Sequence, residues 1–372
     1  MTRFTLDPAS LLDVLTANLT KILGREPGPI DIMPLPQDAS ARRYYRLKGP
    51  LFKSREIIGP TIILMVLAEP NPWRKPDEIA TGNRSLPCRA PREKDLDFVS
   101  VLRHFEAIGL PVPRLYCYDI PAGLLYLEDL GDDLLETAVR RLSVRQMRGY
   151  YQQALDLMLK IHEDGTSLRN DEFAPFQRAF DETLLFAEFV HYIEYGIEAR
   201  KGIKVASADL QVMEDQMRAI SREIASQPRV LVHRDFQSRN IVVQGERLRI
   251  LDFQDALMGV RQHDLVCLLR DSYVVLDSEP VDFLIEYYVH KLEAREKKKV
   301  DRVHFRRVFD LVTLQRKIKD AGRFDYIAIV KGNSKFLRHI PATLEYVTEA
   351  FDRLPEYAPL RKTLAKYTPE LT

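Results

Sequence analysis

The segment 231–256 contains side chains whose types and spacing suit phosphoryl transfer. It reads LVHRDFQSRNIVVQGERLRILDFQDA, and it holds His233, Asp235 and Asn240 in the pattern H-x-D-x4-N, followed by Asp252 and Phe253. A carboxylate can orient an attacking hydroxyl and accept its proton, while Mg²⁺ prefers oxygen ligands from carboxylates and amides. We therefore expect Asp235 to act as the catalytic base, and Asn240 and Asp252 to hold magnesium.

His233 is the remaining member of this predicted catalytic group. It precedes the expected base by two residues, and a loop of this kind needs a side chain that braces its backbone. We expect His233 to form such a bracing hydrogen bond, with Asp264 as a candidate partner. Its predicted role is therefore structural support of the catalytic loop.

The elements that must position these residues alternate early in the chain between helix and strand patterns. Apolar residues at helical spacing predict an amphipathic helix over 7–23, and a polar stretch with five prolines predicts a surface loop over 69–91. A further helix is predicted over 92–108. Short β-branched or aromatic runs bounded by Gly and Pro predict strands at 30–35, 43–47, 61–67, 114–119 and 124–128.

The rest of the chain is predicted to be mostly helical. Helical periodicity covers 143–162, 181–199, 207–226, 281–298, 301–320 and 341–353. Strands at 230–232, 241–243 and 248–251 interrupt the helices and flank the predicted catalytic residues. We therefore expect an α+β chain with an N-terminal domain over 1–130 and a C-terminal domain over 131–372.

Composition excludes several classes of partner. The net charge of +1 gives no overall electrostatic reason to bind nucleic acid or a membrane. No apolar run reaches the length of a spanning helix, and the first residues lack the apolar stretch of a signal peptide, so we expect a cytoplasmic protein. Cys88, Cys117 and Cys267 are far apart and lack metal-ligand spacing, which favours a packing role.

The loop and its following Asp-Phe resemble those of the aminoglycoside phosphotransferase and choline kinase superfamily. They also match the catalytic loop of protein kinases, but the chain lacks G-x-G-x-x-G, V-A-I-K and A-P-E, and Gln254 replaces the glycine of D-F-G. A protein substrate is therefore disfavoured. Further blocks resemble the anomeric N-acetylmuramate and N-acetylglucosamine kinases of bacterial cell-wall recycling: QDASARRYYRL, GLPVPRLYCYD, LLYLEDLG, FDETLLFAEF, LDFQDALMGVRQHDLVCLLRDSY and LVTLQRKIKDAGRF.

This resemblance implies a protein-kinase-like fold of two lobes that uses ATP and Mg²⁺. The N-terminal lobe would be a small antiparallel sheet and the C-terminal lobe mostly helical, with 69–91 as an inserted loop. Ser40, in the turn 37–42, would then lie over the phosphates, and the segment 127–130, with Glu128 and Leu130, would hold the adenine. The strand 62–65 lacks the usual phosphate-binding lysine, so Arg43 is favoured as its replacement, with Arg42 or metal and backbone alone as alternatives.

The acceptor is predicted from charge. The segment 281–340 contains 15 Lys or Arg against 8 Asp or Glu, which disfavours a polycationic aminoglycoside and favours a neutral or anionic sugar. Asp255 could hold a sugar hydroxyl or a second magnesium. An arginine could pair with the lactyl carboxylate of N-acetylmuramate, and the candidates are Arg234, Arg239, Arg270 and Arg316.

Three hypotheses follow for the function. The first is a kinase that makes a sugar 1-phosphate, acting as a monomer with the sugar and ATP as its small-molecule partners. The second keeps the chemistry but uses an aminoglycoside, choline, homoserine or another hydroxyl compound. The third is a nucleotide-binding scaffold without turnover, for which the missing strand lysine is the only support.

Overall fold

A computed structural model of the chain describes residues 8–36, 42–50, 59–67, 96–120, 122–170 and 173–372. Its described residues form two compact units. The first unit consists of the described residues within Met1–Pro76, Cys88–Leu96 and Val112–Asp132. The second unit consists of the described residues within Asp77–Pro87, Asp97–Pro111 and Asp133–Thr372. The helix α2 (Asp97–Ala107), counted with the N-terminal domain in the sequence analysis, clusters with the second unit.

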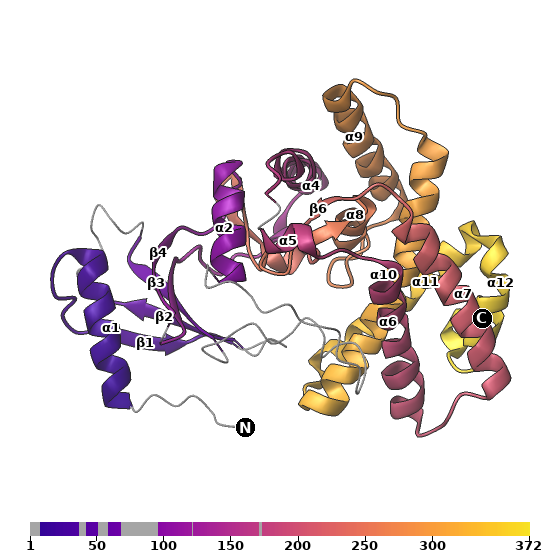
Figure 1. Cartoon of the computed structure of the whole chain (residues 1–372), viewed down its shortest axis with the longest axis horizontal. Helices are drawn as coiled ribbons and strands as arrows, with labels where there is room; N and C mark the ends of the chain where they lie inside the picture. Colours follow the sequence, from indigo (N-terminus) through magenta and orange to yellow (C-terminus); the bar gives the residue numbers. More distant parts are fainter. Residues whose placement is uncertain (1–7, 37–41, 51–58, 68–95, 121, 171–172) are drawn as a thin grey trace. The chain divides into compact units, whose positions relative to one another are not determined.

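The first unit is built on an antiparallel sheet with the strand order β1-β2-β3-β5-β4 (Figure 1). The five predicted strands are all present. Their bounds are β1 (Asp31–Pro34), β2 (Arg43–Lys48), β3 (Thr61–Val66), β4 (Leu115–Asp119) and β5 (Leu124–Glu128). The interior strand β5, which pairs with β3 on one side and with β4 on the other, is buried along its whole length.

The helix α1 (Pro8–Leu23) covers one face of this sheet. Its apolar residues Leu15, Leu19 and Leu23 pack against sheet residues that include Ile62 and Tyr126. Burying a leucine side chain in this way contributes about 2 kcal/mol. The predicted amphipathic helix is therefore confirmed.

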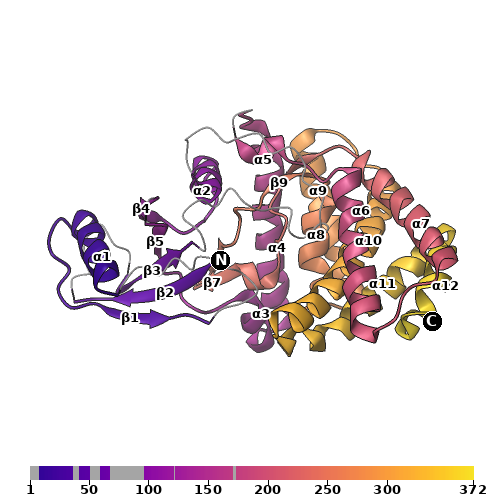
Figure 2. The same cartoon turned by 60° about the horizontal axis from the view of Figure 1, so that its bottom comes forward.

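The second unit is mostly helical. Figure 2 shows α6, α7, α10, α11 and α12 gathered together, and α10 packs against α6, α7 and α11. The longer helices are α2 (Asp97–Ala107), α4 (Val144–Lys160), α6 (Glu182–His191), α7 (Ser207–Ala225), α8 (Gln262–Leu269), α9 (Ser278–Glu296), α10 (Arg302–Lys331), α11 (Ile340–Arg353) and α12 (Ala358–Ala365), with π-helical turns η3 (Ile161–Gly165) and η4 (Tyr192–Ala199). Shorter helices are α3 (Leu135–Ala138), α5 (Ala174–Gln177) and the 3₁₀ turns η2 (Val139–Arg141), η5 (Ser238–Asn240), η6 (Ser334–His339), η7 (Pro355–Tyr357) and η8 (Pro369–Leu371).

Two small antiparallel ribbons lie among these helices. The strand β6 (Val230–Val232) pairs with β9 (Leu257–Gly259), and β7 (Ile241–Gln244) pairs with β8 (Arg247–Ile250). The sequence predicts β6, β7 and β8 but not β9, which has only three residues. It also missed α8 and α12, since each has only eight residues and is too short for a clear helical period.

The helix α10 is longer than predicted. It continues to Lys331 rather than ending at 320, and Gly332 ends it in a left-handed conformation with a φ of 69°. Gly322 obscured the pattern, because glycine disfavours a helix interior. The packing explains this glycine: a Cβ there would lie 2.6 Å from the Cα of Tyr192, so α10 and η4 meet through their backbones.

Among the residues that the structure describes, no helix has both the length and the apolar character needed to cross a bilayer.

Candidate active site

The loop between β6 and β7 presents the predicted catalytic residues, and a buried aspartate fixes its backbone. Asp264, on α8, accepts hydrogen bonds from the backbone N–H groups of His233 at 2.7 Å and Arg234 at 2.9 Å. Arg234 adopts a left-handed conformation with a φ of 80°. For a non-glycine residue this costs about 1–2 kcal/mol. Because both amides reach one carboxylate, Asp264 holds the loop in this strained shape.

Asp264 is itself held by a buried network. His162 lies with Nε2 at 3.1 Å from the carboxylate and with Nδ1 at 2.6 Å from the hydroxyl of Tyr288. Burial alone would raise the pKa of Asp264, but the hydrogen bonds from His162 and His263 and the nearby histidines outweigh burial and lower it. The carboxylate is therefore ionised when it receives the loop amides.

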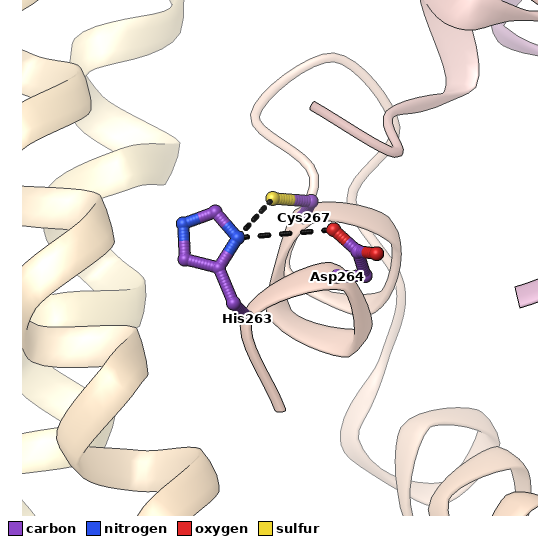
Figure 3. A group of neighbouring side chains, drawn as sticks. All are labelled: His263, Asp264 and Cys267. Atoms are coloured by element: carbon purple, nitrogen blue, oxygen red, sulfur yellow. Dashed lines mark hydrogen bonds and ion pairs between the residues drawn. The ribbon is translucent and has the colours of Figure 1, made fainter. Parts of the chain in front are cut away.

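His263, Asp264 and Cys267 lie together on α8, as Figure 3 shows. Their candidate ligand atoms are close enough for a metal ion, yet each residue already has a structural contact. The Asp264 oxygens accept the loop amides, the Cys267 thiol lies 3.2 Å from the carbonyl oxygen of Arg234, and the ring of His263 stacks on Phe180. Burial raises the pKa of Cys267 to about 12, so its thiol stays protonated. The three residues act as a support for the loop.

His233 braces the loop in a different way from the one predicted. Its side-chain Nε2 lies 2.9 Å from the carbonyl oxygen of Leu251, while its backbone N–H is the group that meets Asp264. Leu251 immediately precedes Asp252, and its own N–H donates to the carbonyl of Asn240. The buried imidazole therefore ties the loop to the segment that carries Asp252.

Asp235 lies among cations. Arg316 of α10, fully buried, donates from Nη2 to the Oδ1 of Asp235 at 2.5 Å and from Nη1 to the carbonyl of Arg234 at 3.1 Å. Burial alone would raise the pKa of Asp235, but the charges of Arg316, Lys319 and Arg234 outweigh it and hold the pKa well below its usual range. The carboxylate is thus ionised at physiological pH. About a third of the Asp235 side chain is exposed to solvent.

The two predicted metal ligands are oxygen donors held in defined orientations. Asn240 donates from Nδ2 to the backbone carbonyl of Asp235 at 2.8 Å, which leaves its Oδ1 as the acceptor. Asp252 is exposed and left-handed, with a φ of 60°, and Gln254 donates from one amide nitrogen to both Asp252 and Asp255 at 2.9 Å. An amide oxygen and exposed carboxylates are the hard donors that Mg²⁺ requires, so these residues fit magnesium.

A family model described as the phosphotransferase enzyme family matches residues 31–299, most of the chain. The chain belongs to this family. It is accordingly an ATP-dependent kinase, and the loop described above lies inside the matched region.

Curated relatives of this kinase are named N-acetylmuramate/N-acetylglucosamine kinases. The relative from Pseudomonas aeruginosa is 27% identical over 338 residues, which cover 91% of this chain and 88% of the relative. The relative from Caulobacter vibrioides is 27% identical over 340 residues, covering 89% of this chain and 90% of the relative. The resemblance to N-acetylmuramate/N-acetylglucosamine kinases that was inferred from the sequence is therefore confirmed.

Solved structures confirm the kinase-like fold. A choline kinase from Cryptosporidium parvum superposes with a TM-score of 0.59 at 11% identity, covering 94% of this chain and 98% of that chain. An ADP-bound aminoglycoside phosphotransferase gives a TM-score of 0.52 at 15% identity, covering 93% and 99%. At such identities the likeness concerns the fold alone.

The structure brings only some of the kinase's predicted acceptor arginines to Asp235. Arg316 contacts the carboxylate of Asp235 directly. Arg234, which precedes Asp235 in the chain, lies 3.8 Å from the buried Glu188. Arg239 pairs instead with Glu136 at 2.9 Å and covers the ring of Tyr273. Arg270 is buried and pairs with Glu349 of α11 at 2.9 Å, so it is not available to a ligand in this arrangement.

The nucleotide-binding residues predicted in the first unit stay predictions. Ser40 lies outside the described residues, and Arg43 is exposed on β2. The backbone N–H of Glu128 donates to the carbonyl of Arg114 at 2.8 Å, and Leu130 follows the end of β5 as a buried residue. The strand β3 contains no lysine, as its sequence shows.

Arg46 is a residue of the first unit that the sequence analysis missed. It makes hydrogen bonds to Asp129 at 2.6 Å and to Asp132 at 2.8 Å, and Thr61 also donates to Asp129. These bonds connect β2 and β3 with the segment that follows β5. The hydrogen bonds that Arg46 donates to Asp132 and Asp129 raise the pKa of Arg46 far above its usual value. The spacing of Arg46 gave no signal, since its partners lie more than eighty residues away.

Replacing Asp264 with asparagine will destabilise the second unit and slow turnover. The buried carboxylate receives three donors, and an amide cannot accept all of them, so we expect a loss of about 2–4 kcal/mol in the free energy of unfolding. Thermal and urea unfolding of the variant measure this loss.

A matched control is Asp310→Asn, which removes another buried carboxylate, one that pairs with Arg306 and Arg353 rather than with the loop. Both variants should lose stability, but only Asp264→Asn should lower kcat in the fraction that remains folded. Equal kcat values would show that Asp264 does not position the loop.

Proposed function

We propose that this kinase transfers the γ-phosphoryl group of ATP to the anomeric hydroxyl of N-acetylmuramate or N-acetylglucosamine. The observation that carries the proposal is the surroundings of Asp235, which are cationic rather than acidic. The names of the curated relatives support the same acceptors.

The proposed chemistry centres on one carboxylate oxygen. Arg316 occupies the Oδ1 of Asp235, and no donor among the described residues reaches the other oxygen. That second oxygen can therefore accept a hydrogen bond from the acceptor hydroxyl and orient its oxygen for in-line attack. The proton passes to Asp235 as the acceptor oxygen bonds to the γ-phosphorus and the bond from that phosphorus to the bridging oxygen of ADP breaks, so that ADP leaves.

The lowered pKa of Asp235 makes it a weak base, which suits an acidic hydroxyl. An anomeric hydroxyl is more acidic than an ordinary alcohol, so less basicity is needed to remove its proton late in the transfer. Orientation of the attacking oxygen is then the main contribution of Asp235.

Asn240 and Asp252 would hold magnesium, which supplies charge neutralisation for the phosphates when bound. Gln254 donates from one amide nitrogen to Asp252 and to Asp255 and so joins the two carboxylates. Asp255 would hold a sugar hydroxyl or a second magnesium.

The charges around Asp235 favour a neutral or anionic amino sugar over a polycationic aminoglycoside as the acceptor. An aminoglycoside is a polycation, and its site should offer carboxylates that are not already paired. Here Arg316 neutralises Asp235, and Lys319 and Arg234 lie close to Glu188.

The cytoplasmic location and the monomeric state expected from the sequence stay predictions.

The test is ADP release with Mg-ATP and a panel of acceptors: N-acetylmuramate, N-acetylglucosamine, glucose, kanamycin, choline and no acceptor. Phosphorus NMR then locates the new phosphate. Turnover with an amino sugar and a signal from an anomeric phosphate would support the proposal. Turnover only with kanamycin or choline would replace it with the alternative acceptors. Nucleotide binding without turnover of any acceptor would count against the proposed acceptors.

A further inference from the structure

The helix α10 carries three cations on the face that meets Asp235. Arg316, Lys319 and Arg323 are spaced three and four residues apart, which places them on one side of a helix. The charges of Arg316 and Lys319 both lower the pKa of Asp235, and the carboxylate of Asp235 in turn acts on Arg323. The three cations therefore extend along α10 from the catalytic carboxylate.

Two of these cations have less compensating negative charge than Arg316. Arg316 is paired with Asp235 and Asp320. Lys319 lies 3.6 Å from Asp320, which it shares with Arg316 and Lys317, and it acts on the buried Glu188, which it shares with Arg234 and Arg316. Among the described residues, no carboxylate lies within ion-pairing distance of Arg323. Its guanidinium instead lies 4.9 Å from the centre of the Tyr326 ring.

An aromatic cluster lies beside the two cations. The rings of His191, Tyr195 and Tyr326 lie 4.8–5.3 Å apart, centre to centre, where α6 and η4 pack on α10. The Nε2 of His191 is buried and has no hydrogen-bond partner among the residues that the structure describes. Burial and the charges of Arg323 and Lys319 lower the pKa of His191 to about 4, so the ring is neutral. The π-helical turn η4, a feature often found at functional sites, carries Tyr195 into this cluster.

We propose that Lys319 and Arg323, with His191 and the two tyrosines beside them, form the subsite that receives a carboxylate carried by the sugar acceptor. This inference rests on the proposed function, and it makes the acidic amino sugar the preferred substrate over its neutral counterpart. The tyrosine rings offer an apolar surface to the C–H groups of a sugar, while the cations pair with its acid.

The position of the cations favours the acceptor over the transferred phosphoryl group as their partner. The phosphoryl group must lie in line with the hydroxyl that Asp235 orients, and therefore close to the Asp235 carboxylate. Arg323 lies seven residues further along α10, a rise of about 10 Å. An acid attached to the sugar ring lies several bonds away from the anomeric oxygen, so a cation displaced along α10 from Asp235 suits the acid better than the transferred group.

The experiment compares kcat/KM for N-acetylmuramate and N-acetylglucosamine in the full-length kinase and in Arg323→Gln and Lys319→Gln. A charge-assisted hydrogen bond lost from the acid should lower the preference ratio, acid over neutral sugar, by about 10- to 100-fold in either variant, chiefly through KM. Arg323→Lys keeps the charge and should recover part of the ratio. Arg218→Gln is the matched control, since it removes another arginine stacked on an aromatic ring, Phe186 of α6, and should leave the ratio as it is.

Each outcome decides the inference. A fallen ratio that Arg323→Lys recovers supports the subsite. Equal losses for both sugars would assign the cations to the phosphoryl group, and an unaltered ratio would give them no role in acceptor choice; either result overturns the inference while the proposed function stands. Turnover of neither sugar by the unmodified kinase would overturn the proposed function, and the subsite with it.

Discussion

Replacing Asp235 with asparagine will lower kcat by at least about 10³-fold while nucleotide affinity stays within about threefold. Asparagine keeps the size of the side chain and can still accept a hydrogen bond from Arg316, but it can no longer take a proton from the acceptor. ADP release under saturating Mg-ATP measures the first effect. Calorimetric titration with a non-hydrolysable ATP analogue measures the second.

The matched control for this change is Asp277→Asn. Asp277 is an exposed residue before α9 whose side chain makes no capping hydrogen bond, so the same chemical change there should leave kcat unaltered. Turnover by Asp235→Asn at a rate near that of the control would remove Asp235 from the role of base. A loss of both turnover and nucleotide binding would indicate that the substitution disrupts the loop rather than the chemistry.

Replacing Asp252 with asparagine will weaken the binding of Mg-ATP by at least about 10-fold. Asparagine is preferred to alanine here, because Asp252 has a left-handed backbone with a φ of 60°, and asparagine tolerates this conformation. The amide can still accept the hydrogen bond from Gln254, so the change removes the negative charge and little else. Nucleotide affinity, titrated with and without magnesium, measures the effect.

The dependence on magnesium distinguishes a metal ligand from a structural residue. Affinity for ATP in the absence of magnesium should be similar in Asp252→Asn and in the unmodified kinase, because no carboxylate–metal bond is then lost. Undiminished affinity for Mg-ATP would place the metal elsewhere. An equal loss with and without magnesium would assign Asp252 to the shape of the nucleotide site instead.

Local patterns in the sequence identified most of the elements correctly. The β-branched runs predicted all five strands of the first unit, and the leucines of α1 predicted the helix that covers them. The errors fall where local pattern and packing disagree. The predicted helix ended at 320, but α10 continues through Gly322, because that glycine lets the backbone of α10 meet η4. Short elements such as β9 were missed, since three residues carry no period.

The partners of the four candidate arginines could not be predicted from the sequence. Arg234, Arg239, Arg270 and Arg316 were equivalent candidates, yet only the first and last lie beside Asp235. A side chain's partner is set by packing between elements far apart in the chain, as with Arg316 and Asp235, which are 81 residues apart. Arg323 and Lys319 were overlooked for the same reason, because only the packing of α10 shows which face of the helix meets the loop.

The sequence by itself determined the class of reaction, phosphoryl transfer, since the residue types and spacing of H-x-D-x4-N and the later Asp252 are local properties of a loop and its hairpin. It also determined the α+β class, because helical and strand periodicities are local. Only the tertiary structure decided which charges surround Asp235, which carboxylate holds the loop, and which cations of α10 lie on the face that meets the loop. These depend on burial and on contacts between distant elements, where charges act strongly because little water screens them.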